Sequence, residues 1–212
     1  MKVAVFGATG GVGRKVVEQL LAGEDEVTAV VREASRLRMR HPRLRIFAVA
    51  GLATPEPLWP ALEGADAVIS AVGPRRRSDG PVASTATKAI LRAMARTAVR
   101  RFIALSATPV GPASPEDGFL MRRVMLPVIR IILPDLYIDL ARMEGTIELS
   151  GMDWTVVRPP RLTDGPAAGG YRSVIGGNVP NGYSISRADV ADAMCAALRS
   201  PATVDKVVSV AD

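Results

Sequence analysis

The feature that most constrains the fold of this chain is a glycine-rich turn near its start, within VAVFGATGGVGRKVVEQLLAG (residues 3–23). An apolar, β-branched run ends at Gly7, glycines follow at positions 10, 11 and 13, and apolar residues then recur with helical spacing. A strand that turns directly into a helix leaves free backbone N–H groups at the helix start, where they bind anions. The spacing Gly-x-x-Gly-x-x-Gly therefore predicts a site for the pyrophosphate of a dinucleotide.

Three of these glycines have separate roles in this interpretation. Gly7 allows the tight turn, Gly10 lets the backbone approach the phosphates, and Gly13 lets the helix pack closely on its strand. The residues of this turn that we expect at the dinucleotide are Gly7, Ala8, Thr9, Gly10, Gly11, Val12, Gly13 and Arg14.

The end of the second predicted strand (26–32) bears on which dinucleotide binds. An acidic residue about 20 positions past the glycines would bind the ribose 2′-hydroxyl of NAD, whereas an arginine accommodates the 2′-phosphate of NADP. Arg32 and Glu33 are candidates for these two roles. Arg32 leaves the strand first and Arg36 follows closely, while Glu33 suits the start of a helix, where an acidic group complements the helix dipole. The sequence therefore favours NADP, held by Arg32 and Arg36.

Short β-branched runs alternate with helical patterns as far as residue 158, which is typical of parallel strands joined by crossover helices. Strands are predicted at 2–7, 26–32, 44–50, 66–73, 101–107, 153–159 and 206–211, and helices at 11–23, 34–40, 55–64, 81–99 and 186–200. The pattern also predicts one or two broken helices over 119–151, a hairpin over 171–178, and a capping box between Ser186 and Asp189. We expect one α/β domain over residues 1–212, a doubly wound parallel sheet (Rossmann fold) with a small C-terminal region on the substrate side.

Composition excludes several function classes. With one cysteine, Cys195, and one histidine, His41, we expect no disulfide, no metal centre and no Ser-His or Cys-His pair. We expect Cys195 to be buried and His41 to be exposed. The net charge of +6 favours anionic partners, but no helix-turn-helix or zinc pattern indicates nucleic-acid binding. No leader pattern and no uncharged stretch of about 20 residues is found, so we expect a cytoplasmic protein without membrane contact.

Five segments, which together cover most of residues 1–165, carry a resemblance to a known family: FGATGGVGRKVVEQLL, VTAVVRE, LEGADAVISAVG, RFIALSA and LARMEGTIELSGMDWTVVRPPRL. They resemble the atypical short-chain dehydrogenase/reductases with an NAD(P)H-binding, NmrA-like fold. Within that family the chain is most similar to the flavin reductase/biliverdin-IXβ reductase branch. This resemblance implies a Rossmann fold and a nicotinamide cofactor.

The resemblance also implies further site residues. In that family the segment after the fourth strand borders the adenosine and ribose, the end of the fifth strand faces the nicotinamide, and the loop after the sixth strand holds the carboxamide side. The matching positions here are Val72, Gly73, Pro74 and Arg75, then Ser106 and Ala107, then Pro159, Pro160, Arg161 and Leu162. Two positions depart from the pattern: Leu52 follows Gly51 where many members have an aspartate, and Arg161 replaces the histidine of the branch.

The Tyr-x-x-x-Lys dyad of the better-known dehydrogenases is missing. The residues four positions after Tyr137, Tyr171 and Tyr183 are Ala141, Ile175 and Arg187. In the dyad the lysine lowers the tyrosine pKa for proton transfer, and an arginine differs from a lysine in geometry and hydration. We therefore do not expect alcohol–ketone interconversion.

An electron-poor acceptor such as a flavin, a quinone or a conjugated tetrapyrrole needs no such dyad, because the nicotinamide carries the hydride chemistry. Ser106 and Arg161 are the catalytic candidates, as a hydrogen-bonding group and as a positive charge near the reduced acceptor. The apolar segment 119–133 is either a cap over the acceptor, part of the core, or a dimer face. Two functions remain open: an NADPH-dependent reductase of a small aromatic acceptor, and a non-catalytic NADP(H) sensor like the NmrA regulators. The sequence does not indicate an oligomeric state.

Overall fold

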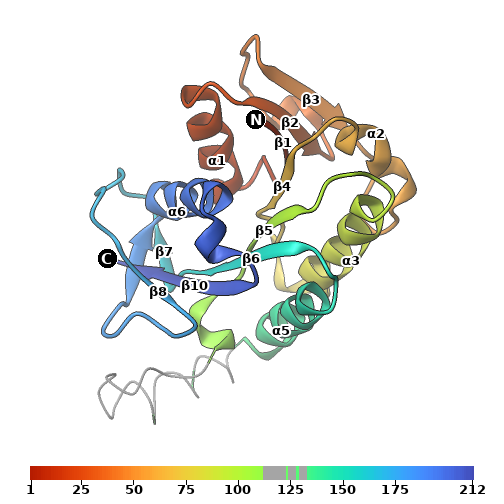
Figure 1. Cartoon of the computed structure of the whole chain (residues 1–212). Helices are drawn as coiled ribbons and strands as arrows, with labels where there is room; N and C mark the ends of the chain where they lie inside the picture. Colours follow the sequence, from red (N-terminus) through yellow and green to blue (C-terminus); the bar gives the residue numbers. More distant parts are fainter. Residues whose placement is uncertain (112–122, 124–127, 129–132) are drawn as a thin grey trace.

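The apolar, β-branched runs of the sequence lie side by side in one mostly parallel sheet (Figure 1). The computed structural model describes residues 1–111, 123, 128 and 133–212. The strand order is β3-β2-β1-β4-β5-β6-β10-β8, in which only β8 runs antiparallel to its neighbour among the described strands. The strands are β1 (Lys2–Phe6), β2 (Glu26–Val31), β3 (Leu44–Ala48), β4 (Ala67–Ser70), β5 (Arg101–Leu105), β6 (Asp153–Arg158), β8 (Arg172–Ile175) and β10 (Lys206–Ala211).

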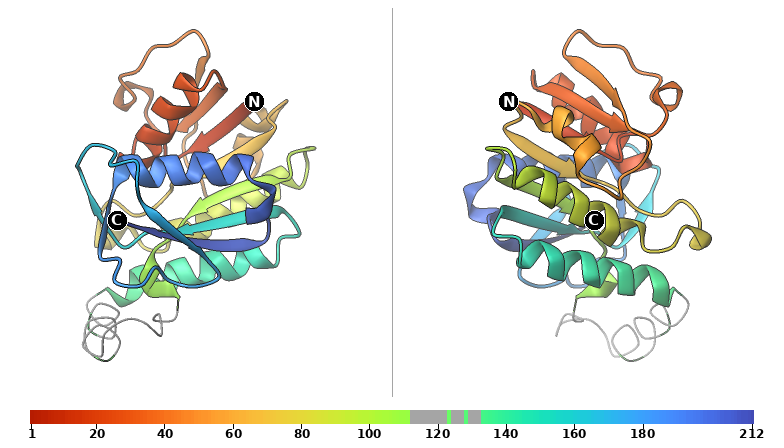
Figure 2. Two further views of the ribbon diagram at one scale, coloured as in Figure 1. Left: turned by 60° about the vertical axis from the view of Figure 1, so that its left-hand side comes forward. Right: turned by 90° about the vertical axis from the view of Figure 1, so that its right-hand side faces the viewer.

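Helices cover both faces of the sheet, as expected for a doubly wound fold (Figure 2). One face carries α1 (Gly11–Ala22) and α6 (Arg187–Arg199), and the other carries α2 (Trp59–Leu62), α3 (Val82–Met94) and α5 (Pro134–Glu148). Successive residues of β5 point to opposite faces: Ile103 packs with α1 and α6, and Phe102 packs with α3 and α5. The predicted Rossmann class is therefore confirmed.

Several local predictions were wrong. Residues 171–178 form no hairpin, because β8 pairs with the C-terminal strand β10, with Ile175 opposite Val208. The helix predicted over 34–40 is one 3₁₀ turn, and the helix predicted over 81–99 ends at Met94. A small parallel pair formed by β7 (Arg161–Thr163) and β9 (Ser184–Ser186) was not predicted. Short 3₁₀ turns lie at Ala34–Arg36, Glu56–Leu58, Arg77–Asp79, Thr108–Val110 and Pro201–Thr203.

Two further expectations concern the middle of the chain and its histidine. Of the predicted helices over 119–151, the structure describes α5, and the segment 119–133 lies outside the described residues except at positions 123, 128 and 133. His41 is partly buried rather than exposed. Its Nδ1 accepts a hydrogen bond from the backbone N–H of Arg43 (3.2 Å).

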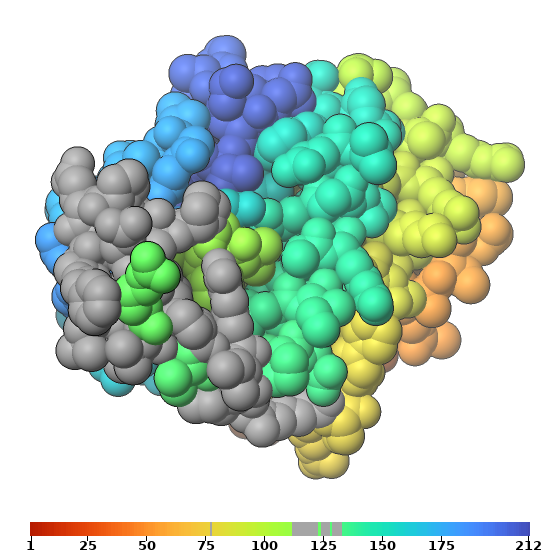
Figure 3. All heavy atoms as spheres, turned by 90° about the horizontal axis from the view of Figure 1, so that it is seen from below, coloured from red at the N-terminus to blue at the C-terminus, as the bar shows by residue number. Residues whose placement is uncertain are grey.

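A buried carboxylate on α5 fixes the start of α3. Asp139 accepts hydrogen bonds from the backbone N–H groups of Ala83 (2.8 Å) and Ser84 (3.0 Å), and from the Ser84 hydroxyl. Seen from below, α5 forms part of the surface and α3 lies beside it (Figure 3). The first turn of α3 is therefore held by a side chain distant in sequence, and this turn lines the site described below.

At the amino-terminal ends of the strands, the partly buried Arg101 joins β6, α6 and the turn at Pro201–Thr203. Arg101 begins β5, and its guanidinium donates to the carbonyl of Asp153 (2.8 Å), the hydroxyl of Thr155 (2.8 Å), the carbonyl of Ala197 (2.6 Å) and the hydroxyl of Thr203 (3.0 Å). Burial lowers the pKa of this guanidinium from its usual value. The amino-terminal ends of β5 and β6 are thereby tied to the end of α6.

Within the part of the chain that the structure describes, no helix is both long enough and apolar enough to cross a bilayer. The cytoplasmic location stays a prediction from the sequence.

Candidate functional site

A cavity of about 610 Å³ opens at the carboxyl ends of the central strands. Its floor lies where the strand order reverses, because β1 has β2 on one side and β4 on the other. Open α/β sheets bind ligands at this switch point. Of the expected site residues, those that line the cavity are Gly7, Thr9, Gly10, Gly11, Val12, Arg32, Val72, Gly73, Pro74, Arg75 and Leu162.

The structure gives a different reason for glycine at each of three positions in the turn. Gly7 has a positive φ of 76°, and a Cβ there would lie 2.5 Å from the carbonyl oxygen of Ala71. A Cβ on Gly13 would lie 2.2 Å from the carbonyl oxygen of Gly7, so the helix packs directly on the turn. A Cβ on Gly10 would approach only the Gly7 oxygen, at 3.2 Å, and is otherwise free. Gly7 and Gly13 are thus required by the protein itself, whereas the space beside Gly10 is open to a ligand.

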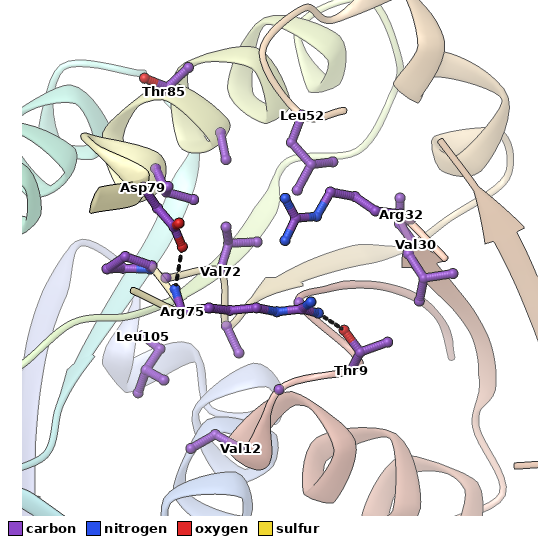
Figure 4. A pocket seen from close by; sticks show the side chains of 18 of the residues that line it. Thr9, Val12, Val30, Arg32, Leu52, Val72, Arg75, Asp79, Thr85 and Leu105 are labelled. Atoms are coloured by element: carbon purple, nitrogen blue, oxygen red, sulfur yellow. Dashed lines mark hydrogen bonds between the residues drawn. The ribbon is translucent and has the colours of Figure 1, made fainter. Parts of the chain in front are cut away.

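Arg32 and Arg75 are two of the three arginines among the described residues that line the cavity (Figure 4). The Arg75 guanidinium donates to the Thr9 hydroxyl (3.0 Å), and the Arg75 backbone N–H donates to Asp79 (2.8 Å). Backbone hydrogen bonds from Arg76 and Arg75 lower the pKa of Asp79, and the charge of Arg32 adds to the effect. The exposed Arg32 side chain points into the cavity beside Leu52 and has no hydrogen bond or ion pair with any described residue.

Glu33, the competing acidic residue, is held outside the cavity lining. Its carboxylate accepts from the Ser35 hydroxyl (2.9 Å) and from Arg36 (2.6 Å), and these two hydrogen bonds lower its pKa. Arg36 is therefore paired with Glu33 and does not line the cavity. Its predicted contact with a dinucleotide stays a prediction.

Ser106 lies in a buried polar cluster beside the cavity. Its hydroxyl donates to Glu144 of α5, and the Arg158 guanidinium donates to the same carboxylate through Nε (3.0 Å) and Nη2. Ser106 and Glu144 are buried, and Leu105 lines the cavity in place of Ser106. The one hydroxyl hydrogen of Ser106 is thus already used within the protein. Glu144 and Arg158 were missed from the sequence, although each is a charged residue in a largely apolar segment.

The loop after β6 contributes less than the resemblance implied. Leu162 lines the cavity, and since neighbouring strand residues point to opposite sides, Arg161 of β7 projects away from it. Arg161 is exposed. The remaining expected site residues also lie outside the cavity lining: Ala8, Gly13, Arg14, Ala107, Pro159 and Pro160.

A family model described as NAD(P)H-binding matches residues 7–201 of the chain. The chain belongs to this NAD(P)H-binding family. A relative at 29% identity, an uncharacterized chloroplastic protein of Arabidopsis thaliana, aligns with 99% of this chain and 76% of its own length. The NAD(P)H-binding family that the resemblance implied is confirmed.

Solved structures share the fold of this NAD(P)H-binding chain at low identity. A short-chain dehydrogenase/reductase of Veillonella parvula, solved in complex with NADP, matches with a TM-score of 0.82 at 18% identity, covering all of this chain and 94% of the other. An anaerobillin reductase of Escherichia coli O157:H7 matches with a TM-score of 0.80 at 21% identity, covering all of this chain and 97% of the other. These structures confirm the fold.

Arg187 is among the cavity-lining residues that the sequence did not indicate. Arg187 begins α6 and faces Gly11, and it pairs with Asp164 (2.6 Å).

The predicted capping box at the start of α6 is formed in part, since the Ser186 hydroxyl accepts a hydrogen bond from the Asp189 backbone N–H (3.0 Å). The Asp189 carboxylate instead accepts hydrogen bonds from Ser186 Oγ (2.6 Å) and from the backbone N–H groups of Ala168 and Gly169 (both 3.0 Å). It thereby anchors the loop before β8.

Proposed function

We propose that this protein is an NADPH-dependent reductase that transfers hydride to a small aromatic or conjugated acceptor. The observation that carries the proposal is the contrast between Arg32 and Glu33. Arg32 presents an unpaired guanidinium to the cavity, whereas Glu33 is bonded to Ser35 and Arg36. A free guanidinium at the end of β2 suits the 2′-phosphate of NADP, and no carboxylate is directed at a ribose 2′-hydroxyl from this position.

The residues present fit a dinucleotide. The open space beside Gly10 admits a pyrophosphate close to the N–H groups at the start of α1. Val72, Pro74 and Arg75 line the same cavity. When bound, the nicotinamide supplies the hydride. The chain's own residues bind and orient the cofactor and exclude water from it.

The end of the cavity near β5 suits an apolar acceptor. Leu105 ends β5 and lines the cavity there. Leu162, Val82 and Ala86 are further apolar residues of the cavity lining, and Thr85 adds a hydroxyl. Among the residues that the structure describes, no tyrosine, lysine or histidine lines this cavity. An acceptor that takes hydride without a protein proton donor at its reacting atom fits this lining, and flavins, quinones and conjugated tetrapyrroles are of that class.

The lack of a tyrosine, lysine or histidine in the described lining also favours the second candidate, a non-catalytic NADP(H) sensor. Turnover separates the two functions: the purified protein is mixed with NADPH and a panel of flavins, quinones and linear tetrapyrroles, and nicotinamide absorbance is followed. The reductase proposal expects loss of absorbance with at least one acceptor. Tight NADPH binding with no turnover of any acceptor would favour the sensor.

Variants of Ser106 and Arg161 test the two catalytic candidates in the same assay. Removing a preorganised group that stabilises charge in the transition state costs roughly 2–4 kcal/mol. If Ser106 or Arg161 has that role, its alanine variant should have a lower kcat that corresponds to a loss of roughly 2–4 kcal/mol of transition-state stabilisation. The NADPH affinity of Ser106→Ala should change little. Unchanged turnover in both variants would assign Ser106 to the buried cluster with Glu144 and Arg158 and Arg161 to the surface.

A further inference from the structure

Arg187 lies between two cavities at the start of α6. It lines the large cavity together with Gly10 and Gly11, and it also lines a smaller cavity of about 250 Å³ on its other side, next to Asp164. Its side chain is about 30% exposed. A cation in this place is within the region where the glycine turn would receive phosphates.

The Arg187 side chain occupies the space that a side chain at position 11 would take. A Cβ added to Gly11 would lie 2.6 Å from Cδ and 2.8 Å from Nε of Arg187. Gly11 is the first residue of α1 and has no positive φ, so its backbone does not require a glycine. The missing side chain at position 11 therefore makes room for the Arg187 side chain beside the start of α1.

The present partner of Arg187 is a weak competitor. Arg187 Nη1 lies 2.6 Å from Oδ1 of Asp164, whose side chain is 90% exposed. Ion pairs with so exposed a partner contribute little to stability, because water and salt screen them. A pyrophosphate in the glycine turn carries two negative charges and accepts several hydrogen bonds at once, so it competes well for a guanidinium.

We propose that Arg187 is a pyrophosphate-binding residue, and that a bound dinucleotide displaces Asp164 as the partner of its guanidinium. This inference rests on the proposed NADP(H) site and adds to it a contact from α6, which lies about 175 residues after the turn in the chain. Gly11 is then a positioning residue, since its role is to seat the arginine. Asp164 competes with the cofactor for the Arg187 guanidinium.

Calorimetry with two ligands tests the proposal. NADP⁺ contains the pyrophosphate, whereas 2′-AMP keeps the adenosine and the 2′-phosphate but lacks it. Arg187→Ala should weaken NADP⁺ binding about 10- to 100-fold, the range for losing a hydrogen bond to a charged group, and should leave 2′-AMP binding unchanged. Asp164→Asn should bind NADP⁺ as tightly as the parent or a few-fold more tightly.

A double substitution distinguishes Gly11 as a seat for Arg187 from Gly11 as a general part of the turn. Gly11→Ala should weaken NADP⁺ binding in the parent but cause little further loss in the Arg187→Ala protein. Arg142→Ala, which removes one exposed charge from α5, is the matched control and should bind both ligands as the parent does. Melting curves verify that each variant is folded.

The outcomes separate this inference from the proposed function. If the parent binds neither NADP⁺ nor 2′-AMP, the proposed function fails. If the parent binds NADP⁺ and Arg187→Ala binds it equally well, or loses NADP⁺ and 2′-AMP to the same extent, only the role of Arg187 is overturned. Weaker NADP⁺ binding by Asp164→Asn would also overturn it, since the ion pair would then support the site rather than compete with the ligand.

Discussion

At the scale of single residues, neighbouring side chains at the end of β2 have opposite environments. Arg32 is unpaired and directed into the cavity, while the Glu33 carboxylate is bonded to Ser35 and Arg36. The sequence offered both residues as candidates and favoured Arg32, which leaves the strand first, and it is Arg32 that lines the cavity. The short 3₁₀ turn after Glu33 brings Ser35 and Arg36 within reach of the carboxylate, and this turn was predicted as a longer helix.

The first prediction follows from this difference. Arg32→Ala should weaken NADPH binding by about 1.5–3 kcal/mol, the usual contribution of a hydrogen bond to a charged group, and should leave NADH binding nearly unchanged. Titration calorimetry with both nucleotides measures the difference. Equal losses for NADPH and NADH, or tighter binding of NADH by the parent, would contradict the assignment.

The second prediction separates two glycines of the same turn. Gly10→Val should abolish binding of NADP(H) and NAD(H) while the protein still melts cooperatively, because the added side chain occupies open space beside the turn. Gly13→Ala should instead lower the melting temperature, because its Cβ would lie 2.2 Å from the Gly7 carbonyl oxygen. Retained dinucleotide affinity in a folded Gly10→Val protein would place the phosphates elsewhere.

At the scale of elements, the local patterns were predictable and the partners were not. The strand, turn and helix of residues 2–22 follow from neighbouring residues, so they were found from sequence. The pairing of β8 with β10, the cluster of Ser106 with Glu144 and Arg158, and the approach of Arg187 to Gly11 each join segments far apart in the chain. Hydrophobic periodicity contains no information about which distant segment lies opposite, so these contacts were missed or mispredicted.

The third prediction concerns the connection between α5 and α3. Asp139→Ala should lower the free energy of unfolding by about 2–4 kcal/mol, because it leaves two backbone N–H groups at the start of α3 and one hydroxyl without their acceptor. Ser84→Ala should cost about 1 kcal/mol, since the backbone hydrogen bonds to Asp139 remain. Urea denaturation measures both values. Equal stability of the Asp139→Ala protein and the parent would show that α3 needs no such cap.

At the scale of the whole molecule, one hydrophobic core lies on each face of the sheet. Cys195 lies within the core between α6 and the sheet, and burial raises the pKa of its thiol to about 12. The thiolate is the reactive form of cysteine. Burial keeps reagents away from this thiol, and the raised pKa keeps it protonated, so both lower its reactivity. Its expected burial is confirmed.

The fourth prediction uses this thiol as a reporter of folding. At pH 8 the native protein should react with Ellman's reagent only as fast as it opens, and the denatured protein should react at once. NADP⁺ at about 100 times its dissociation constant should slow labelling by about 100-fold if labelling requires loss of the binding site, because the ligand stabilises the folded state by about 2.7 kcal/mol. Rapid labelling of the native protein, or a rate unaffected by a bound ligand, would show that α6 opens independently.

The cluster around Arg101 gives the two edges of the sheet separate duties. Four hydrogen bonds from this guanidinium join β6, α6 and the turn at Pro201–Thr203 at the amino edge, while the cavity occupies the carboxyl edge. The residues that anchor the strands are therefore separate from the residues that line the cavity, which is useful for protein engineering. The wall formed by Leu105, Leu162 and Val82 is open to redesign for a different acceptor while the anchoring edge is left untouched, so that selectivity and heat tolerance become adjustable one at a time.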